Sequence, residues 1–145
     1  MIRLVCLLLL FGVAHVGLAA SGDDWRRSPK PIREAVRATV EAQLSAIREN
    51  NFAQAYEYAS AGVRERFTEG VFAAMIRRGY PALVRHTQAD VGAVRDDGKN
   101  RARVSVTVFD RLNRSTSYRY LLIEEEAGWR IEGVVGEVAP PQKEI

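Results

Sequence analysis

Apolar and polar residues alternate along the chain with two different periods, and the change of period separates a helical first half from a stranded second half. Between residues 32 and 47 the apolar side chains recur every three or four positions, at Ile32, Val36, Val40, Leu44 and Ile47. This spacing predicts one long amphipathic helix. Pro31 directly precedes it, and proline is favoured in the first turn of a helix.

Two shorter helices are expected next. The spacing i, i+3, i+4, i+7 predicts a second helix with apolar positions at Phe52, Ala55, Tyr56 and Ala59. A single helical turn is expected at 63–67, and Thr68 is a suitable N-cap for a third helix. Gly79 is expected directly after the end of that helix, and Pro81 is expected to prevent its continuation.

After about residue 85 the period changes to two, which is typical of half-buried strands. Residues 101–108 alternate in this way, and the turn sequence 96–100 joins them to an earlier strand at 87–95. Two further strands are expected at 116–125 and 129–137. Helices followed by antiparallel strands predict an α+β fold, with three N-terminal helices packed on one face of a four-stranded antiparallel sheet.

The first twenty residues resemble a secretory signal peptide. One positive charge at Arg3 is followed by an apolar run from Leu4, and small residues follow at Ala19 and Ala20. We expect residues 1–19 to be cleaved and the protein to be periplasmic or secreted, with no membrane contact afterwards. An uncleaved membrane anchor is the alternative, because the apolar run only just reaches the length that spans a bilayer.

The remaining chain is expected to form one domain. Residues 20–31 are polar and contain prolines, which predicts an extended lead-in; residues 32–138 form the α+β domain, and 139–145 a flexible tail. The only cysteine, Cys6, leaves with the signal segment, so the domain cannot contain a disulfide.

Composition excludes several functions. Removal of Arg3 leaves 20 basic and 18 acidic residues, a balance that argues against a nucleic-acid partner. The two histidines of the chain, His15 and His86, fall on either side of the cleavage point, so a metal site built from histidine and cysteine is excluded in the mature chain. No catalytic motif or phosphate-binding glycine loop is found, and no cofactor is expected.

The residues of the second and third predicted helices resemble a known family. The segment Asn51–Ser60, then Phe67, Phe72–Ile76 and Gly79–Pro81, with Gly128–Ile131 in the last strand, is similar to the exported proteobacterial domain-of-unknown-function family 4864. The similarity covers about residues 32–135. It implies a cone-shaped, nuclear-transport-factor-2-like (cystatin-like) half-barrel in which a curved sheet wraps a long helix. It implies no catalytic residues.

We interpret the chain as a non-catalytic binding or accessory module of the cell envelope with a small apolar pocket. A small apolar ligand would lie between the helices and the sheet, against Val40, Leu44, Phe52, Tyr56, Phe72, Met75, Tyr80, Tyr118 and Tyr120. The alternative is that these side chains simply fill a closed core.

The competing hypothesis is a cavity enzyme of the isomerase or dehydratase kind, in which an acid or base acts inside the cone. Its candidate groups are Tyr80, His86, Asp110, Tyr118 and Tyr120. Each also has a structural interpretation: Asp110 as the cap of a turn, His86 as a surface or strand-edge residue, and the tyrosines as core residues with their hydroxyls at the rim.

One strand suggests an assembly. In the strand 116–125, Tyr118, Tyr120 and Leu122 lie on one face, and Leu121 and Ile123 lie on the other. A strand that is apolar on both faces is expected to be covered on both. Either a loop of the same chain or a second copy of the chain could cover this second face. The second alternative would be a homodimer formed through the sheet.

Overall fold

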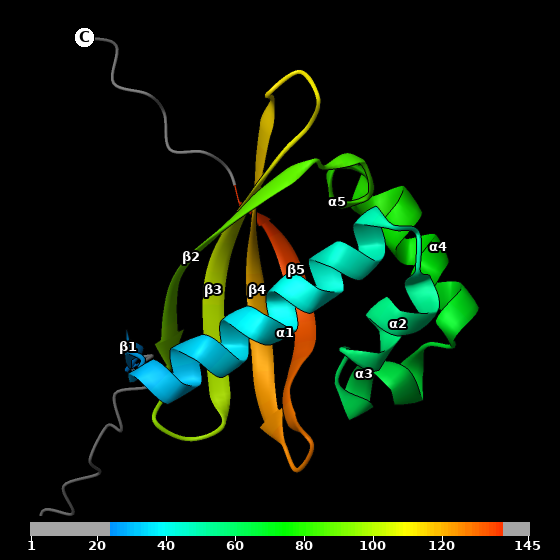
Figure 1. Ribbon diagram of the computed structural model, residues 1–145. Coiled ribbons are helices and arrows are strands. Elements are labelled where there is room, and N and C mark those ends of the chain that lie inside the picture. The colour runs from blue at the N-terminus through cyan, green and yellow to red at the C-terminus, as the bar shows by residue number, and fades with distance from the viewer. Residues whose placement is uncertain (1–23, 138–145) are drawn as a thin grey trace, which may run out of the picture.

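The computed structural model describes residues 24–137; the predicted signal segment and the predicted tail lie outside the described residues (Figure 1). It contains helices and an antiparallel sheet, which confirms the α+β class. The helices are α1 (Lys30–Arg48), α2 (Phe52–Glu57), α3 (Ala61–Arg66), α4 (Glu69–Gly79) and α5 (Pro81–Arg85). The strands are β1 (Arg26–Arg27), β2 (Gln88–Asp96), β3 (Arg101–Phe109), β4 (Ser115–Glu125) and β5 (Gly128–Glu137).

Helix α1 is the long amphipathic helix that the apolar spacing predicted. It runs for 19 residues with Pro31 in its first turn, and it lies across the concave face of the sheet (Figure 1). Its buried face contains Val36, Val40, Leu44 and Ile47. Four such side chains out of water contribute on the order of 6–12 kcal/mol of hydrophobic stabilisation before conformational entropy is subtracted, so packing rather than helix propensity stabilises α1.

The sheet has the strand order β1-β2-β3-β4-β5, and every neighbouring pair is antiparallel. Because successive side chains point to opposite faces, one set faces α1 and the other forms the outer face. The buried inner set on the two central strands is Ala102, Val104, Val106, Val108, Tyr118, Tyr120 and Leu122. Irregularities between Val91 and Val94 in β2 and beside Leu121 in the β4–β5 pairing accompany the curl of the sheet around α1.

Helices α2 to α4 gather at one end of the domain beside β5 (Figure 1). Each begins at a side-chain cap: Asn51, Ser60 and Thr68 accept from the backbone N–H groups of Gln54, Val63 and Val71. A short parallel bridge joins Ala59 to Ile131, so the connection between α2 and α3 is attached to the outer edge of β5. This attachment blocks part of an otherwise open sheet edge.

The predicted counts of three helices and four strands are wrong, because the described residues form five of each. The turn expected at 63–67 is the helix α3, and the segment after α4 forms α5. The extra strand is β1, which the sequence placed in an extended lead-in. These elements contain six residues or fewer, too short to show a helical or strand period on their own.

One of the two expected helix-end signals differs from the structure. Gly79 is the last residue of α4 and does not have a positive φ, so it is not the left-handed residue after the helix end. Pro81 follows the end of α4, as expected, and also occupies the first turn of α5. Proline suits that position because the first turn of a helix has no use for its missing N–H.

Candidate functional site

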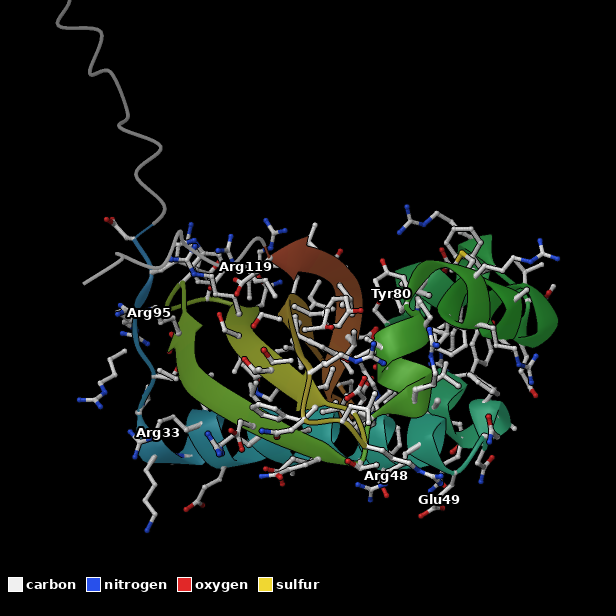
Figure 2. All side chains as sticks on the ribbon, turned by 90° about the horizontal axis from the view of Figure 1, so that it is seen from above. Arg33, Arg48, Glu49, Tyr80, Arg95 and Arg119 are labelled. Atoms are coloured by element: carbon white, nitrogen blue, oxygen red, sulfur yellow. The ribbon has the colours of Figure 1, made fainter. Side chains whose placement is uncertain are left out.

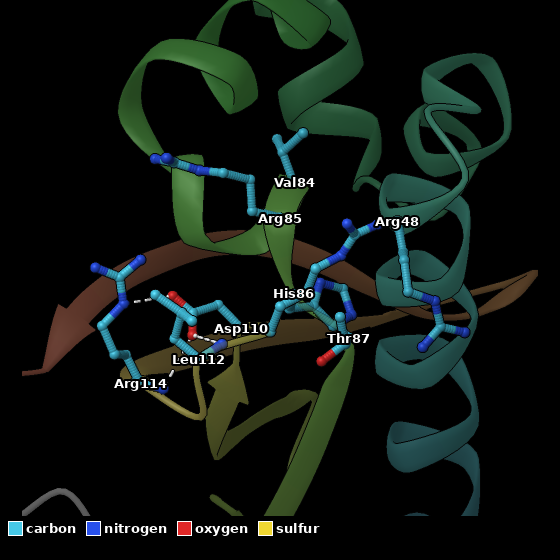
Figure 3. Close-up of a pocket in the computed structure, with 9 residues that line it drawn as sticks. Arg48, Val84, Arg85, His86, Thr87, Asp110, Leu112 and Arg114 are labelled. Carbon is cyan, nitrogen blue, oxygen red and sulfur yellow. Dashed lines mark hydrogen bonds and ion pairs between the residues drawn. The ribbon is translucent and has the colours of Figure 1, made fainter.

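A hollow of about 660 Å³ lies where α1, α5 and the β3–β4 turn meet (Figure 3). Its lining residues are Arg48, Val84, Arg85, His86, Thr87, Asp110, Arg111, Leu112 and Arg114. We call it the end pocket. A second hollow of about 360 Å³ adjoins it and shares Arg85, Asp110 and Arg114.

The end pocket is strongly basic. Four guanidinium groups and one carboxylate line it, which leaves three net positive charges. They come from three parts of the fold: Arg48 from the end of α1, Arg85 from the end of α5, and Arg111 and Arg114 from the β3–β4 turn. Within residues 24–137, Arg114 alone among the four has a carboxylate oxygen within 4.0 Å. Three arginines are therefore available to an external anion.

Asp110 organises the turn that carries two of these arginines. Its Oδ1 accepts from the N–H groups of Leu112 and Arg114 at 2.9 and 3.0 Å, and its Oδ2 accepts from Arg114 Nε at 2.7 Å. The backbone N–H of Arg114 is the largest of several influences that hold the pKa of Asp110 below its ordinary value. The interpretation of Asp110 as a turn cap is confirmed. Both of its carboxylate oxygens accept hydrogen bonds from the turn itself.

His86 is buried in the wall of the pocket, with 2% of its surface exposed. The expectation of a surface or edge histidine is therefore wrong. Its Nδ1–H donates to the carbonyl of Leu83, which leaves Nε2 as the acceptor nitrogen. Burial lowers the pKa of His86, and the charge of Arg48 adds to that effect while the Leu83 hydrogen bond opposes it. The ring is neutral near pH 7, so the arginines supply the positive charge.

None of the residues expected to line an apolar pocket lines the end pocket. Val40, Leu44, Phe52 and Tyr120 belong to the closed core. Three others line a hollow of about 120 Å³ between α4 and β5: Phe72, Met75 and Tyr80. Tyr56 packs its ring against Phe72 at a centroid distance of 5.4 Å, and Tyr118 lies 5.8 Å from the ring of Tyr80.

The tyrosines named as candidate acids do not share a site with His86 and Asp110. Tyr80 donates its hydroxyl to the carbonyl of Val134 at 2.7 Å. Tyr120 is fully buried and its hydroxyl has no partner among the described residues, so the expectation of a hydroxyl at the rim is wrong for Tyr120. Of the five candidates, the structure brings only His86 and Asp110 into one pocket.

Sequence reasoning missed the arginines of the end pocket. They are separated by up to 66 positions and are embedded in a chain that is rich in arginine throughout. Each lies at the end of an element or in a turn, and that position was the only available signal. Which element ends meet in space depends on the packing of α1 and α5 against the sheet.

Two classes of site are not found in the described residues. No group of three His, Cys, Asp or Glu side chains between residues 24 and 137 is arranged to hold a metal ion. The helices of the same region include none that is both long enough and apolar enough to cross a membrane.

Comparison with known proteins adds one relationship. No curated protein and no solved structure matches the chain. A family model described as "Domain of unknown function (DUF4864)" matches residues 29–144, which is most of the chain. The chain therefore belongs to the DUF4864 family.

Proposed function

We propose that this chain is an exported, non-catalytic binding domain that holds a small anionic molecule in the end pocket. One observation carries the proposal: a hollow of about 660 Å³ is lined by three arginines that have no carboxylate partner among residues 24–137. Sites for small molecules usually measure roughly 300–1,000 Å³. Planar guanidinium groups bind carboxylates and phosphates through paired hydrogen bonds.

An anion suits the structure better than the small apolar ligand that the sequence suggested. The apolar hollow beside Phe72 and Tyr80 measures about 120 Å³, which lies below the roughly 300 Å³ at the lower end of ordinary ligand sites. A binding role is also better supported than acid–base catalysis. The Asp110 carboxylate, the Tyr80 hydroxyl and the His86 Nδ1–H are each engaged in a structural hydrogen bond.

The location and fold family of the domain are part of the same proposal. The charged, apolar and small-residue order of residues 1–19 supports export to the periplasm or beyond. The long helix α1 within a curled antiparallel sheet supports a nuclear-transport-factor-2-like, cystatin-like cone. A homodimer through the sheet stays a prediction, and the mass of the native protein in solution tests it.

Calorimetric titration with citrate and with pyrophosphate, at constant ionic strength, tests the binding role. We expect saturable binding that Arg111→Gln weakens about tenfold or more, since a hydrogen bond to a charged group contributes roughly 1.5–3 kcal/mol. Arg64→Gln is the matched control, because Arg64 is exposed on α3 and does not line the end pocket. Absence of saturable binding, or an equal loss in the control, would reject the proposal.

A further inference from the structure

Three arginines stand side by side on the outer face of the sheet. Arg27 of β1 is the direct partner of Arg95 in β2, and Arg95 is the direct partner of Arg103 in β3. Directly opposed residues on antiparallel strands project from the same face, and neighbouring strands are about 4.8 Å apart. We call these residues the outer-face arginine row. Figure 2 shows Arg95 and Arg119 on the side of the sheet away from α1.

The described protein does not neutralise this row. Like charges directly opposite each other destabilise a sheet, yet none of the three arginines has a carboxylate oxygen within 4.0 Å among residues 24–137. Arg103 instead lies over the ring of Trp25, 4.5 Å from its centroid. The carboxylate of Asp96, in the same strand as Arg95, is turned inward and pairs with Arg26. The positive charge of the row is therefore not balanced by any carboxylate among residues 24–137.

A hollow of about 250 Å³ opens beside the row. It is lined by Ala93, Arg95, Arg103, Val104, Ser105 and Arg119. One carboxylate lies at its far edge: Glu137 Oε1 accepts from Arg119 Nε at 2.9 Å and from Ser105 Oγ at 3.2 Å. Positive charge without a partner is thus concentrated at the Arg95–Arg103 end, and none of the lining residues belongs to the end pocket.

We propose that this hollow is a second binding site, which takes a single phosphate group bridged between Arg95 and Arg103. A phosphate carries up to two charges and several acceptor oxygens, so it can accept from two neighbouring guanidinium groups at once. A free phosphate and the headgroup of an anionic phospholipid present the same chemistry.

Two substitutions with opposite expected effects test the site. In a titration with inorganic phosphate, followed by the Nε–H signals of the arginines, we expect Arg95→Gln to raise the half-saturating concentration about tenfold or more. We expect Glu137→Gln to lower it, because Arg119 and Ser105 are then released to the phosphate. Arg64→Gln, exposed on α3 and outside the linings of both hollows, serves as the matched control and leaves this titration unchanged. The signals of Arg95 and Arg103 report on this hollow, whereas the citrate titration reports on the end pocket, so failure here and failure of the proposed function are distinguishable.

Melting temperature gives an independent readout. Without phosphate, Arg95→Gln should melt at or above the wild-type temperature, since it removes both like-charge pairs of the row. With saturating phosphate the wild type should melt higher than Arg95→Gln. Co-sedimentation with phosphatidylglycerol vesicles, compared with neutral phosphatidylcholine vesicles, identifies the source. If the protein binds the anionic vesicles and Arg95→Gln abolishes that binding, the site is supported and its ligand is a lipid headgroup. If only inorganic phosphate saturates the site, the site is supported and its ligand is a soluble phosphate. If neither probe binds, or if Arg95→Gln changes neither response, the proposal is overturned.

Discussion

At the residue scale, Tyr120 is one of four described residues with a buried side-chain polar atom that has no hydrogen-bond partner. Its side chain is fully buried on the inner face of β4, and its hydroxyl has no hydrogen-bond partner among the described residues. Burial raises the pKa of Tyr120 far above its ordinary value, and the neighbouring Tyr118 and Tyr80 add to the effect. Leaving a buried hydroxyl unpaired costs about 1–3 kcal/mol.

Tyr120→Phe should therefore leave the free energy of unfolding unchanged or raise it by up to about 1 kcal/mol, because it removes an unpaired polar atom without changing the ring. Tyr80→Phe is the matched comparison. It removes the hydroxyl that donates to Val134 and should lower the free energy of unfolding by about 1 kcal/mol. Urea denaturation of both variants measures the difference, and a clear loss of stability in Tyr120→Phe would show that its hydroxyl has a partner.

His86 predicts a dependence of stability on pH. Its pKa in the folded protein lies below its ordinary value of 6.5, so the unfolded chain takes up the proton first as the pH falls. The stabilisation that comes from the neutral ring is fully present above pH 6.5. It is lost as the pH falls from 6.5 through the lower pKa of His86 in the folded protein, with a slope of at most about 1.4 kcal/mol per pH unit. His86 is the only histidine after His15.

His86→Gln should accordingly flatten the dependence of stability on pH between about pH 7 and pH 5, where histidine titrates. The variant is expected to be less stable at every pH, because the contact with the Leu83 carbonyl changes, so the slope and not the absolute value is the test. Denaturant midpoints at several pH values provide it. An unchanged slope would mean that His86 is not the group responsible.

At the element scale, β1 is held on the sheet by one buried carboxylate. Only 2% of the Asp96 side chain is exposed; it accepts from Arg26 Nε at 2.9 Å and from the Gly98 N–H at 2.8 Å. Burial opposes its ionisation, but the Ser28 side chain, the Arg26 guanidinium and the Gly98 N–H outweigh it and hold the pKa of Asp96 below its ordinary value. The interaction attaches the first strand and closes the β2–β3 turn.

Asp96→Asn should lower the free energy of unfolding by about 2 kcal/mol, the size expected for hydrogen bonds to a charged group. Asp90→Asn is the control, since Asp90 is exposed in the same strand. Hydrogen exchange should show faster opening at residues 26–28 in Asp96→Asn before the rest of the sheet is affected. Equal protection of these residues in both variants would contradict the role of Asp96 as the attachment of β1.

The long elements could be predicted from the sequence and the short ones could not. The stripe from Ile32 to Ile47 and the alternation in 101–108 extend over enough residues for a period to be visible. Strand β1 has two residues and is supported by its pairing with β2 and by the Arg26–Asp96 ion pair, while α5 has five residues and contains the buried Leu83. Such elements are formed by tertiary contacts that a local pattern does not contain.

At the scale of the whole molecule, the candidate site exists because the ends of α1 and α5 lie next to the β3–β4 turn. Val40 and Leu44 were recognised correctly as inward-facing from their spacing, but spacing alone could not decide whether the interior is open or filled. Arg48 and Arg111 are 63 positions apart in a chain that contains many arginines, so no local pattern indicates that they lie close together. The crossing of α1 over the sheet brings them to one pocket, and that crossing is a property of the complete fold.

The most direct test of the anion-binding account is a map of amide chemical shifts during a citrate titration of the ¹⁵N-labelled chain. The account predicts saturable shifts concentrated at Arg48, residues 84–87 and residues 110–114, and their loss in Arg111→Gln. Shifts concentrated instead around Phe72 and Tyr80, or no saturation at any position, would contradict it.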